Sequence, residues 1–318
     1  MSTVSRTVRL KTKPRPWPPK AVEEAARRYY DHLAEVWPPA AVAARRAYEG
    51  RLRQLTTEGI AGDAPPVALH VLSFSCERDL PEQVASVGSF LAHVGVPTEL
   101  TIVSDGSHSQ DSRDLLEAIH PSITVIDWRS VARPGLPQAL WDYAEISWRG
   151  RKLLVLVSLP VDGPLLYTDA DMLFFAGAVE LRELPSAAGA GPRYLLDCDG
   201  EGPFLDVSML TNPGEEAESI NSGFIFIPRP LDWTPALARL ERRLRSGRAP
   251  FTGQTVVHLT LHGAGARSFD PSRYVVAVDD RSQLEDPYAR PEIVLRHYVM
   301  PVRHKFWTTL SRVPASAG

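Results

Sequence analysis

Two aspartates near the middle of the chain have the spacing of a metal site. Asp169 and Asp171 flank Ala170 within a stretch, 165–175, that is otherwise mostly apolar. In an extended segment, residues i and i+2 project to the same side, so both carboxylates can converge on one cation. At the end of a buried strand, two unpaired carboxylates would repel each other and resist desolvation. A divalent cation removes that conflict, and oxygen ligands favour Mg²⁺ or Mn²⁺, which can hold a diphosphate. The alternative is a pair of loop acids that cap a helix.

The segments around this motif alternate between short apolar strands and helices. Strands are predicted at 67–73, 99–104, 123–126, 165–168, 193–197, 223–227 and 274–278, and helices at 80–94, 111–119, 141–158 and 235–245. This alternation is typical of an α/β fold with a mostly parallel sheet. Ligands of such sheets bind beyond the carboxyl ends of the strands. We therefore expect the polar turns after the first, second and fourth strands to meet at one edge.

The N-terminal part of the chain follows a different pattern. Residues 1–19 are rich in proline and basic residues, which predicts an extended arm, and helical patterns follow at 21–36 and 40–57. We expect the aromatic residues of this extension to pack against the main domain. The predicted organisation is an arm with a helical extension (1–62), one α/β domain (63–312) and a short tail (313–318).

The composition excludes several classes of function. With 44% hydrophobic and 23% charged residues, the 318-residue chain has the balance of a soluble globular enzyme, and its net charge of −3 predicts no general attraction to nucleic acid or anionic lipid. Cys76 and Cys198 have no metal-ligand spacing and are expected to be reduced thiols. The apolar runs are far shorter than the ~20 residues of a membrane span. A cytoplasmic protein without a membrane span or secretory signal is expected.

The stretch GPLLYTDADMLFF (163–175) resembles the metal motif of GT-A glycosyltransferases, particularly the family 8 type that includes glycogenin and bacterial galactosyltransferases. The resemblance extends over roughly 67–307. Its further anchors follow in the family's order: the loop 73–79, Lys152, Asn221-Ser222-Gly223, Gln254 and the stretch 297–307. The resemblance implies a GT-A (Rossmann-like) fold, a mostly parallel sheet flanked by helices. It also implies transfer of a sugar, with retention, from a nucleotide diphosphate donor (UDP above all) to an acceptor that the sequence does not identify.

The same resemblance implies the metal ligands and the donor contacts. His297 would be the third metal ligand beside Asp169 and Asp171, and an imidazole in the shell favours Mn²⁺ over Mg²⁺. Lys305, the only lysine after Lys152, would contact the diphosphate as a point charge. Lys152 would also contact the donor, although with its arginine neighbours it could instead form a solvated basic turn. The complete set of implied nucleotide and donor contacts is Phe74, Ser75, Cys76, Asp105, Lys152, Tyr167, Ala170 and Lys305. For Asp105, an Asp-Gly turn after a strand is equally common for purely conformational reasons.

Three further residues are implied in catalysis. Asn221 and Gln254 would face the donor sugar, where their amides can hold hydroxyl groups. Asp197 and Asp199, the nearest other acidic pair, follow a predicted strand, and one of them, with Asp197 preferred, is expected to bind sugar or acceptor. The family commonly has an acid immediately before the glutamine, whereas this chain has Gly253, which puts the acceptor or sugar-orienting role in question. The terminal stretch 296–307 suits a lid that closes over the diphosphate, the alternative being a permanently packed strand.

Other functions fit the sequence less well. A phosphohydrolase of the haloacid-dehalogenase type needs a helper lysine and then an acidic pair after the motif, but Lys305 lies beyond Asp279 and Asp280. A sugar nucleotidyltransferase needs a glycine-rich phosphate loop, and 73–79 contains no glycine. A non-catalytic nucleotide-sugar or carbohydrate-binding protein on the same fold remains the alternative, which turnover of a nucleotide sugar would distinguish.

Overall fold

A computed structural model describes residues 37–58, 64–186, 191–198, 204–215, 218–247, 251–283 and 285–312. All of them belong to one compact unit that starts at Trp37. The predicted arm (1–19), the first predicted helix (21–36) and the tail (313–318) lie outside the described residues.

The main sheet, within the described residues, has seven strands in the order β3-β2-β1-β4-β7-β6-β8. Their bounds are β1 (Pro66–Ser75), β2 (Val96–Ser104), β3 (Ile123–Asp127), β4 (Leu165–Asp169), β6 (Arg193–Leu196), β7 (Ile220–Ile227) and β8 (Arg267–Ser268). Strands β1 to β4 pair in parallel, as do β6 and β8, whereas β7 runs antiparallel to both β4 and β6. The predicted fold class, a mostly parallel sheet flanked by helices, is confirmed.

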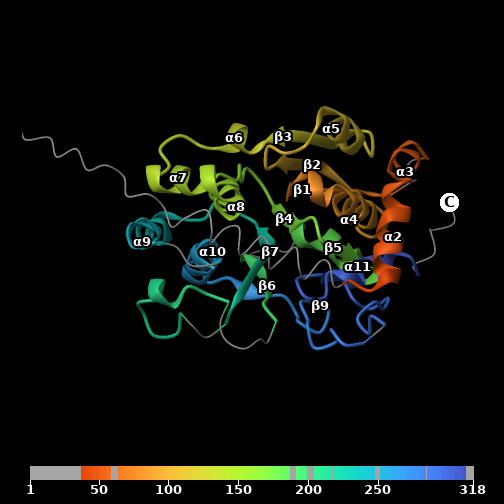
Figure 1. Ribbon diagram of the computed structural model, residues 1–318. Helices are drawn as coiled ribbons and strands as arrows, with labels where there is room; N and C mark the ends of the chain where they lie inside the picture. Colours follow the sequence, from red (N-terminus) through yellow and green to blue (C-terminus); the bar gives the residue numbers. More distant parts are fainter. Residues whose placement is uncertain are drawn as a thin grey trace, which may run out of the picture. The chain divides into compact units, whose positions relative to one another are not determined.

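Side chains alternate between the two faces of the sheet along β4, so they pack into two different hydrophobic cores. Leu166 packs into one core with residues of α4 (Leu80–His93) and α5 (Gln110–Glu117), while Leu165 and Tyr167 pack into the other. The second core also contains residues of α7 (Gln138–Ile146), α8 (Trp148–Val157), α9 (Thr234–Arg245) and α10 (Thr252–Gly263). Figure 1 shows α7 to α10 together on one side of the strands and α4 on the other. Because both faces are covered, the central strands are buried and their ends alone are free to form a site.

A smaller sheet of three described strands has the order β5-β10-β9. It consists of β5 (Met172–Phe174), β10 (Leu295–His297) and β9 (Tyr274–Val275), with β10 antiparallel to β5 and parallel to β9. Since β5 follows β4 after a single turn, this sheet brings the C-terminal part of the chain to the end of β4.

The helices α2 (Pro39–Glu49) and α3 (Leu52–Glu58) replace the single helical pattern predicted at 40–57. In α2, Arg45 Nε donates to Glu82 Oε1 of α4 at 2.9 Å, and the Tyr48 ring lies 5.4 Å from that of Trp307 in α11 (His304–Leu310). The aromatic residues Trp37 and Tyr48 thus pack against the main domain, as expected.

The helix predicted at 141–158 is instead two helices, α7 and α8, separated at Ser147, whose backbone is extended. A Cβ on Gly150 would lie 2.3 Å from Tyr143 O, so only glycine allows the two helices to approach so closely. Because of this break, α8 runs in a direction of its own, and Lys152 in its second turn reaches the metal motif.

Several elements were absent from the sequence-based prediction. Helix α10 is rich in threonine and valine, which have modest helix propensity, and eight of its residues are buried, so tertiary packing decides its conformation. Strands β5 and β10 have only three residues each, too few to show a periodic pattern. The remaining elements that were not predicted are β8, α11, η1 (Glu77–Asp79), α6 (Trp128–Val131), η2 (Ala176–Ser186) and η3 (Val207–Met209).

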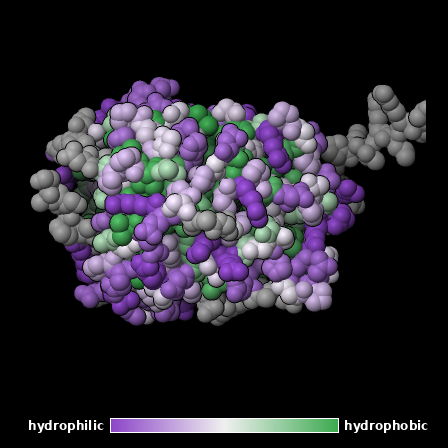
Figure 2. All heavy atoms as spheres, turned by 180° about the vertical axis from the view of Figure 1, so that it is seen from behind, coloured by the Kyte–Doolittle hydropathy of each residue, from purple (hydrophilic) through white to green (hydrophobic). Residues whose placement is uncertain are grey.

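The surface is predominantly polar on the face that Figure 2 shows, where hydrophobic residues appear as small separate patches. Large hydrophobic side chains that are exposed among the described residues are Trp148, Val179 and Val207. None of the described helices combines the length and the apolar character that crossing a bilayer requires.

Candidate metal and donor site

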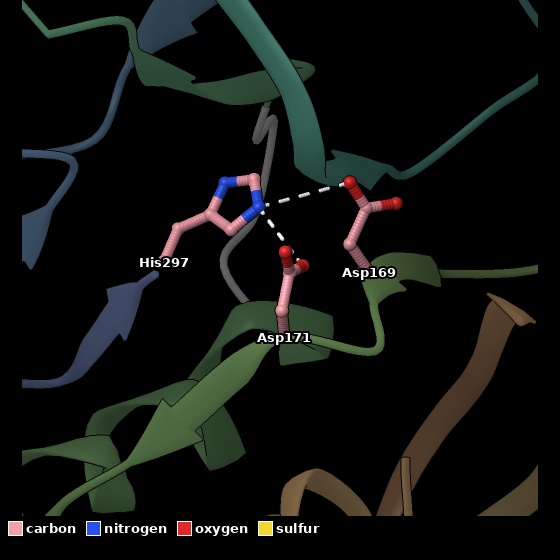
Figure 3. Close-up of side chains that lie close together, drawn as sticks. All are labelled: Asp169, Asp171 and His297. Atoms are coloured by element: carbon pink, nitrogen blue, oxygen red, sulfur yellow. Dashed lines mark hydrogen bonds and ion pairs between the residues drawn. The ribbon is translucent and has the colours of Figure 1, made fainter. Parts of the chain in front are cut away.

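The predicted metal ligands come from three segments that meet at the carboxyl end of β4. Asp169 is the last residue of β4, in register with Phe74 of β1. Asp171 follows after one residue, and its carbonyl accepts a hydrogen bond from Tyr298 N–H at 3.0 Å. In the small sheet, His297 is paired with Met172, directly beside Asp171. Figure 3 shows the three side chains pointing toward one another.

The distances between these side chains fit a single cation. One ligand atom from each of Asp169, Asp171 and His297 lies within 4.8 Å of the other two. His297 Nε2 lies 3.1 Å from Asp171 Oδ1 and 3.8 Å from Asp169 Oδ2. The side chains are 6%, 16% and 18% exposed for His297, Asp171 and Asp169, so the group is largely shielded and still reachable from solvent. Two carboxylates and one imidazole suit Mn²⁺, and Mg²⁺ less well.

The hydrogen bonds of Asn221 decide which nitrogen of His297 faces the carboxylates. Asn221 Oδ1 accepts from Gly223 N–H at 2.9 Å, and its Nδ2 donates to Asp197 Oδ1 at 3.1 Å. These two bonds assign the amide orientation, so that an oxygen lies 3.0 Å from His297 Nδ1. Nδ1 must therefore carry the proton, and in the neutral ring the lone pair is on Nε2, which points at the carboxylates. This is the tautomer that a metal ligand requires.

Gly223 is required at its position because of His297. A Cβ on Gly223 would lie 2.4 Å from His297 Cε1 and 2.7 Å from Nδ1. The motif Asn221-Ser222-Gly223 therefore supports the imidazole in two ways, by accepting a hydrogen bond from Nδ1–H and by leaving room for its ring.

The three residues predicted for catalysis form one hydrogen-bonded cluster. Gln254 Nε2 donates to Asp197 Oδ2 at 2.8 Å and to the Phe204 carbonyl at 3.0 Å. Asp197 is bonded in turn to Asn221, which holds His297. A continuous chain of hydrogen bonds thus connects the glutamine at the start of α10 with the metal group. The structure brings these residues together, and their roles in catalysis stay predictions.

A lysine and a tyrosine are bound to the first aspartate. Lys152 Nζ lies 2.7 Å from Asp169 Oδ2, and Tyr167 O–H donates to Asp169 Oδ1 at 2.8 Å. Burial and the neighbouring carboxylate raise the pKa of Tyr167 well above its usual value, so the phenol stays protonated and acts as a donor. Both residues therefore orient Asp169. The backbone of Ala170, which is buried, completes the turn between the aspartates.

Arg303 is a site residue that the sequence analysis missed. Its Nη2 lies 3.1 Å from Asp79 Oδ1 and its Nη1 lies 3.7 Å from Asp171 Oδ2. Burial disfavours the charged form of Arg303, but the two aspartates outweigh this effect and raise its pKa. Burial would likewise raise the pKa of Asp171, but the positive charge of Arg303 opposes it, and that pKa lies below its usual value. Both groups are therefore ionised at neutral pH.

Lys305, predicted to contact the diphosphate, is directed elsewhere. Its side chain is 1% exposed, and Nζ donates to Asp280 Oδ2 at 2.8 Å and to the Glu285 carbonyl at 2.7 Å. Arg296 donates to the other oxygen of Asp280, so the ammonium belongs to a buried ionic cluster. The basic residue that the stretch 296–307 presents to the metal group is Arg303, two positions earlier. The rarity of lysine in the chain was a misleading signal.

The stretch 296–307, for which the sequence suggested a lid, is packed in this structure. Tyr298, Phe306 and Trp307 are each at most 1% exposed and belong to one hydrophobic cluster. This packing and the ionic cluster around Lys305 fit the alternative of a packed terminal segment, but part of that segment is the helix α11 and not the expected strand. Closure of the segment on donor binding stays a prediction.

The predicted nucleotide loop lies at the same edge of the sheet. Phe74 and Ser75 are buried at the end of β1, where Ser75 O accepts from Asp105 N–H at 2.9 Å. Burial, followed by the charge of Asp79, raises the pKa of the Cys76 thiol to about 12, so it remains protonated at neutral pH. Asp105 Oδ1 accepts from Ser107 N–H at 2.9 Å, which matches the conformational explanation of the Asp-Gly turn. A nucleotide contact by any of these residues stays a prediction.

Comparison with known proteins adds evidence on the fold. The chain matches no protein-family model and no curated protein by sequence. Among solved structures, it is similar to the galactosyltransferase LgtC in complex with donor and acceptor sugar analogues (TM-score 0.50, 12% identity, 76% of this chain and 95% of that one). The chain has the GT-A glycosyltransferase fold. The predicted resemblance is thus confirmed at the level of the fold.

Two larger glycosyltransferases give the same score of 0.50. The bifunctional WbbM is 14% identical, with 78% of this chain and 50% of that chain covered. GlyE of Streptococcus pneumoniae is 10% identical, with 77% and 60% covered. The chain therefore spans half of the WbbM chain and 60% of the GlyE chain.

Proposed function

We propose that this chain is a metal-dependent glycosyltransferase that takes its sugar from a nucleoside diphosphate. The observation that carries the proposal is the convergence of Asp169, Asp171 and His297 at the carboxyl end of β4, on a GT-A fold. The hydrogen bonds of Asn221 support it, because they set the His297 tautomer that a metal ligand needs. UDP as the nucleotide and retention at the anomeric carbon are the finer parts of the proposal and rest on the motif resemblance.

The chain's own residues have distinct roles in this proposal. A bound divalent cation would neutralise the diphosphate as it leaves. Asp169, Asp171 and His297 would hold that cation. Lys152 and Arg303 would face the phosphate oxygens as charge-assisted donors. Asn221 and Gln254 orient the sugar hydroxyls, and Asp197 fixes both amides. The buried side chains around the group keep water from the anomeric carbon.

The test is calorimetry of UDP and a panel of nucleotide sugars with and without Mn²⁺, followed by measurement of released nucleoside diphosphate. We expect binding that requires Mn²⁺ and slow donor hydrolysis in the absence of an acceptor. Asp171→Asn should abolish both. The matched control is Asp111→Asn, because the Asp111 side chain is 80% exposed and pairs with Arg53 on the surface. Binding without release of the nucleotide from any donor would identify a binding protein, and no Mn²⁺-dependent binding would refute the proposal.

A further inference from the structure

Each carboxylate of the metal group already has a cation of the chain itself beside it. The Lys152 ammonium, from α8, lies 2.7 Å from Asp169 Oδ2. The Arg303 guanidinium, which precedes α11, lies 3.7 Å from Asp171 Oδ2 and 3.1 Å from Asp79 Oδ1. Side-chain exposures of 14% for Lys152 and 16% for Arg303 mean that neither charge is fully screened by water.

The charges of the site are close to balanced. Three carboxylates face two cations, which leaves one net negative charge, and Arg78 pairs with Asp79 from a more exposed position and reduces it further. His297 adds no charge when its ring is neutral. A divalent cation that entered alone would therefore make the site net positive. A diphosphate that entered with it would restore the balance.

We infer that Lys152 and Arg303 hold off a free divalent cation and admit it together with the diphosphate. This inference rests on the proposed function and concerns the same site. The Lys152 ammonium donates a hydrogen bond to the Asp169 oxygen that would otherwise bind a metal ion. Its positive charge also repels the ion. The flexible lysine stem lets the ammonium turn to a phosphate oxygen, which releases the carboxylate. The metal and the nucleotide consequently bind with positive coupling, each increasing the affinity of the other by the same factor.

The inference predicts that Lys152→Met increases the affinity for Mn²⁺ alone, which is an unusual effect for the removal of a site residue. A residue that merely lines the site would leave Mn²⁺ affinity unchanged or lower it when removed. Here the variant should bind Mn²⁺ alone more tightly than the wild type, by at least about tenfold, given one repulsive charge at a few ångströms in a partly buried site. Its affinity for UDP should fall, so the coupling factor between Mn²⁺ and UDP should fall too.

The experiment is a titration of the full chain with Mn²⁺, with free Mn²⁺ measured by electron paramagnetic resonance, first alone and then with saturating UDP. Lys152→Arg keeps the positive charge beside Asp169, so its affinity for Mn²⁺ alone should stay as low as that of the wild type. Arg53→Met removes one positive charge at the surface, where Arg53 is 77% exposed, and controls for net charge. If Lys152→Met folds poorly, Arg303→Met provides the same test at Asp171, because it too should bind Mn²⁺ alone more tightly than the wild type.

The outcomes separate the inference from the proposed function. Tighter binding of Mn²⁺ alone to Lys152→Met, but not to Lys152→Arg or Arg53→Met, supports the inference. Equal or weaker binding to Lys152→Met overturns it, while Mn²⁺-dependent binding of UDP to the wild type would still support the metal site. If Mn²⁺ fails to bind to the wild type even with UDP, and Asp171→Asn changes nothing, the proposed function itself is refuted.

Discussion

Replacing Gly223 by alanine tests the metal site through its packing, without substituting any of the ligand residues. A Cβ at this position would lie 2.4 Å from His297 Cε1. Because carbon atoms pack at about 3.5 Å, the imidazole must move by roughly 1 Å. The ring cannot move by that much and keep both its 3.0 Å bond to Asn221 and its approach to Asp171.

We expect Gly223→Ala to weaken Mn²⁺ binding by about 10- to 100-fold, the usual effect of disturbing a residue that orients a metal ligand. The strain should also lower the free energy of unfolding by about 1–3 kcal/mol. Titration with Mn²⁺ in the presence of UDP measures the first effect, and denaturant unfolding measures the second. Gly253→Ala is the matched control, because the nearest atom to its Cβ would be Arg149 O at 3.6 Å, an ordinary contact.

A double variant distinguishes this specific collision from general damage to β7. In Gly223→Ala/His297→Ala the clashing ring is absent, so stability should recover relative to Gly223→Ala, while metal affinity stays low. Wild-type affinity and stability in Gly223→Ala would refute the reasoning. Equal destabilisation in the single and double variants would show that the strain comes from the strand and not from His297.

Three further predictions follow from contacts elsewhere in the structure. Arg303→Met should lower the affinity for UDP at least tenfold more than the affinity for uridine, because a charge-assisted hydrogen bond contributes roughly 1.5–3 kcal/mol. Lys305→Met should mainly lower the free energy of unfolding, by about 3–5 kcal/mol, because it breaks a buried ion pair. The opposite pattern would place Lys305 in the donor site. Because burial raises the pKa of Cys76 to about 12, alkylation by iodoacetamide, followed at the peptide that contains Cys76, should be much slower between about pH 7 and 9 than that of an ordinary thiol, and its rate should keep rising above about pH 9, where that of an ordinary thiol levels off. The hydrogen bond from Arg239 lowers the pKa of Glu215 below its ordinary 4.5 in the folded protein. The ionised Glu215 therefore stabilises the fold above about pH 4.5, and this stabilisation is lost as the pH falls through the folded-state pKa. The Tm of Glu215→Gln should accordingly decline less on acidification than that of the wild type.

The local order of residues was enough to predict the central strands and the pair of carboxylates. Asp169 and Asp171 stand two apart in an apolar strand, and that spacing alone places both side chains on one side. The central strands and α4 have strong apolar patterns over enough residues to be recognised. The position of the site followed as well, because the ends of parallel strands meet at one edge of the sheet.

Contacts between distant segments had to be seen in three dimensions. Arg303 and Lys305 are two positions apart and both basic, and the sequence gives no reason to choose between them. The choice depends on the turn before α11, which directs Arg303 to Asp79 and Asp171 and buries Lys305 against Asp280. The break between α7 and α8 has a similar origin, since Gly150 fits a close contact with Tyr143 O that no local pattern reveals.

The sequence by itself determined that this chain carries a carboxylate pair at the end of a buried strand in a mostly parallel sheet, because strand periodicity and polar turns are local properties. The tertiary structure decided how that pair is completed. It brings β10 alongside β5, so that His297 reaches the carboxylates, and it places Asn221 of β7 where it sets the tautomer of the ring. Both contacts require packing between segments more than 70 residues apart; Asn221 and His297, for example, are separated by 76 positions. No short stretch of residues encodes packing between segments that distant.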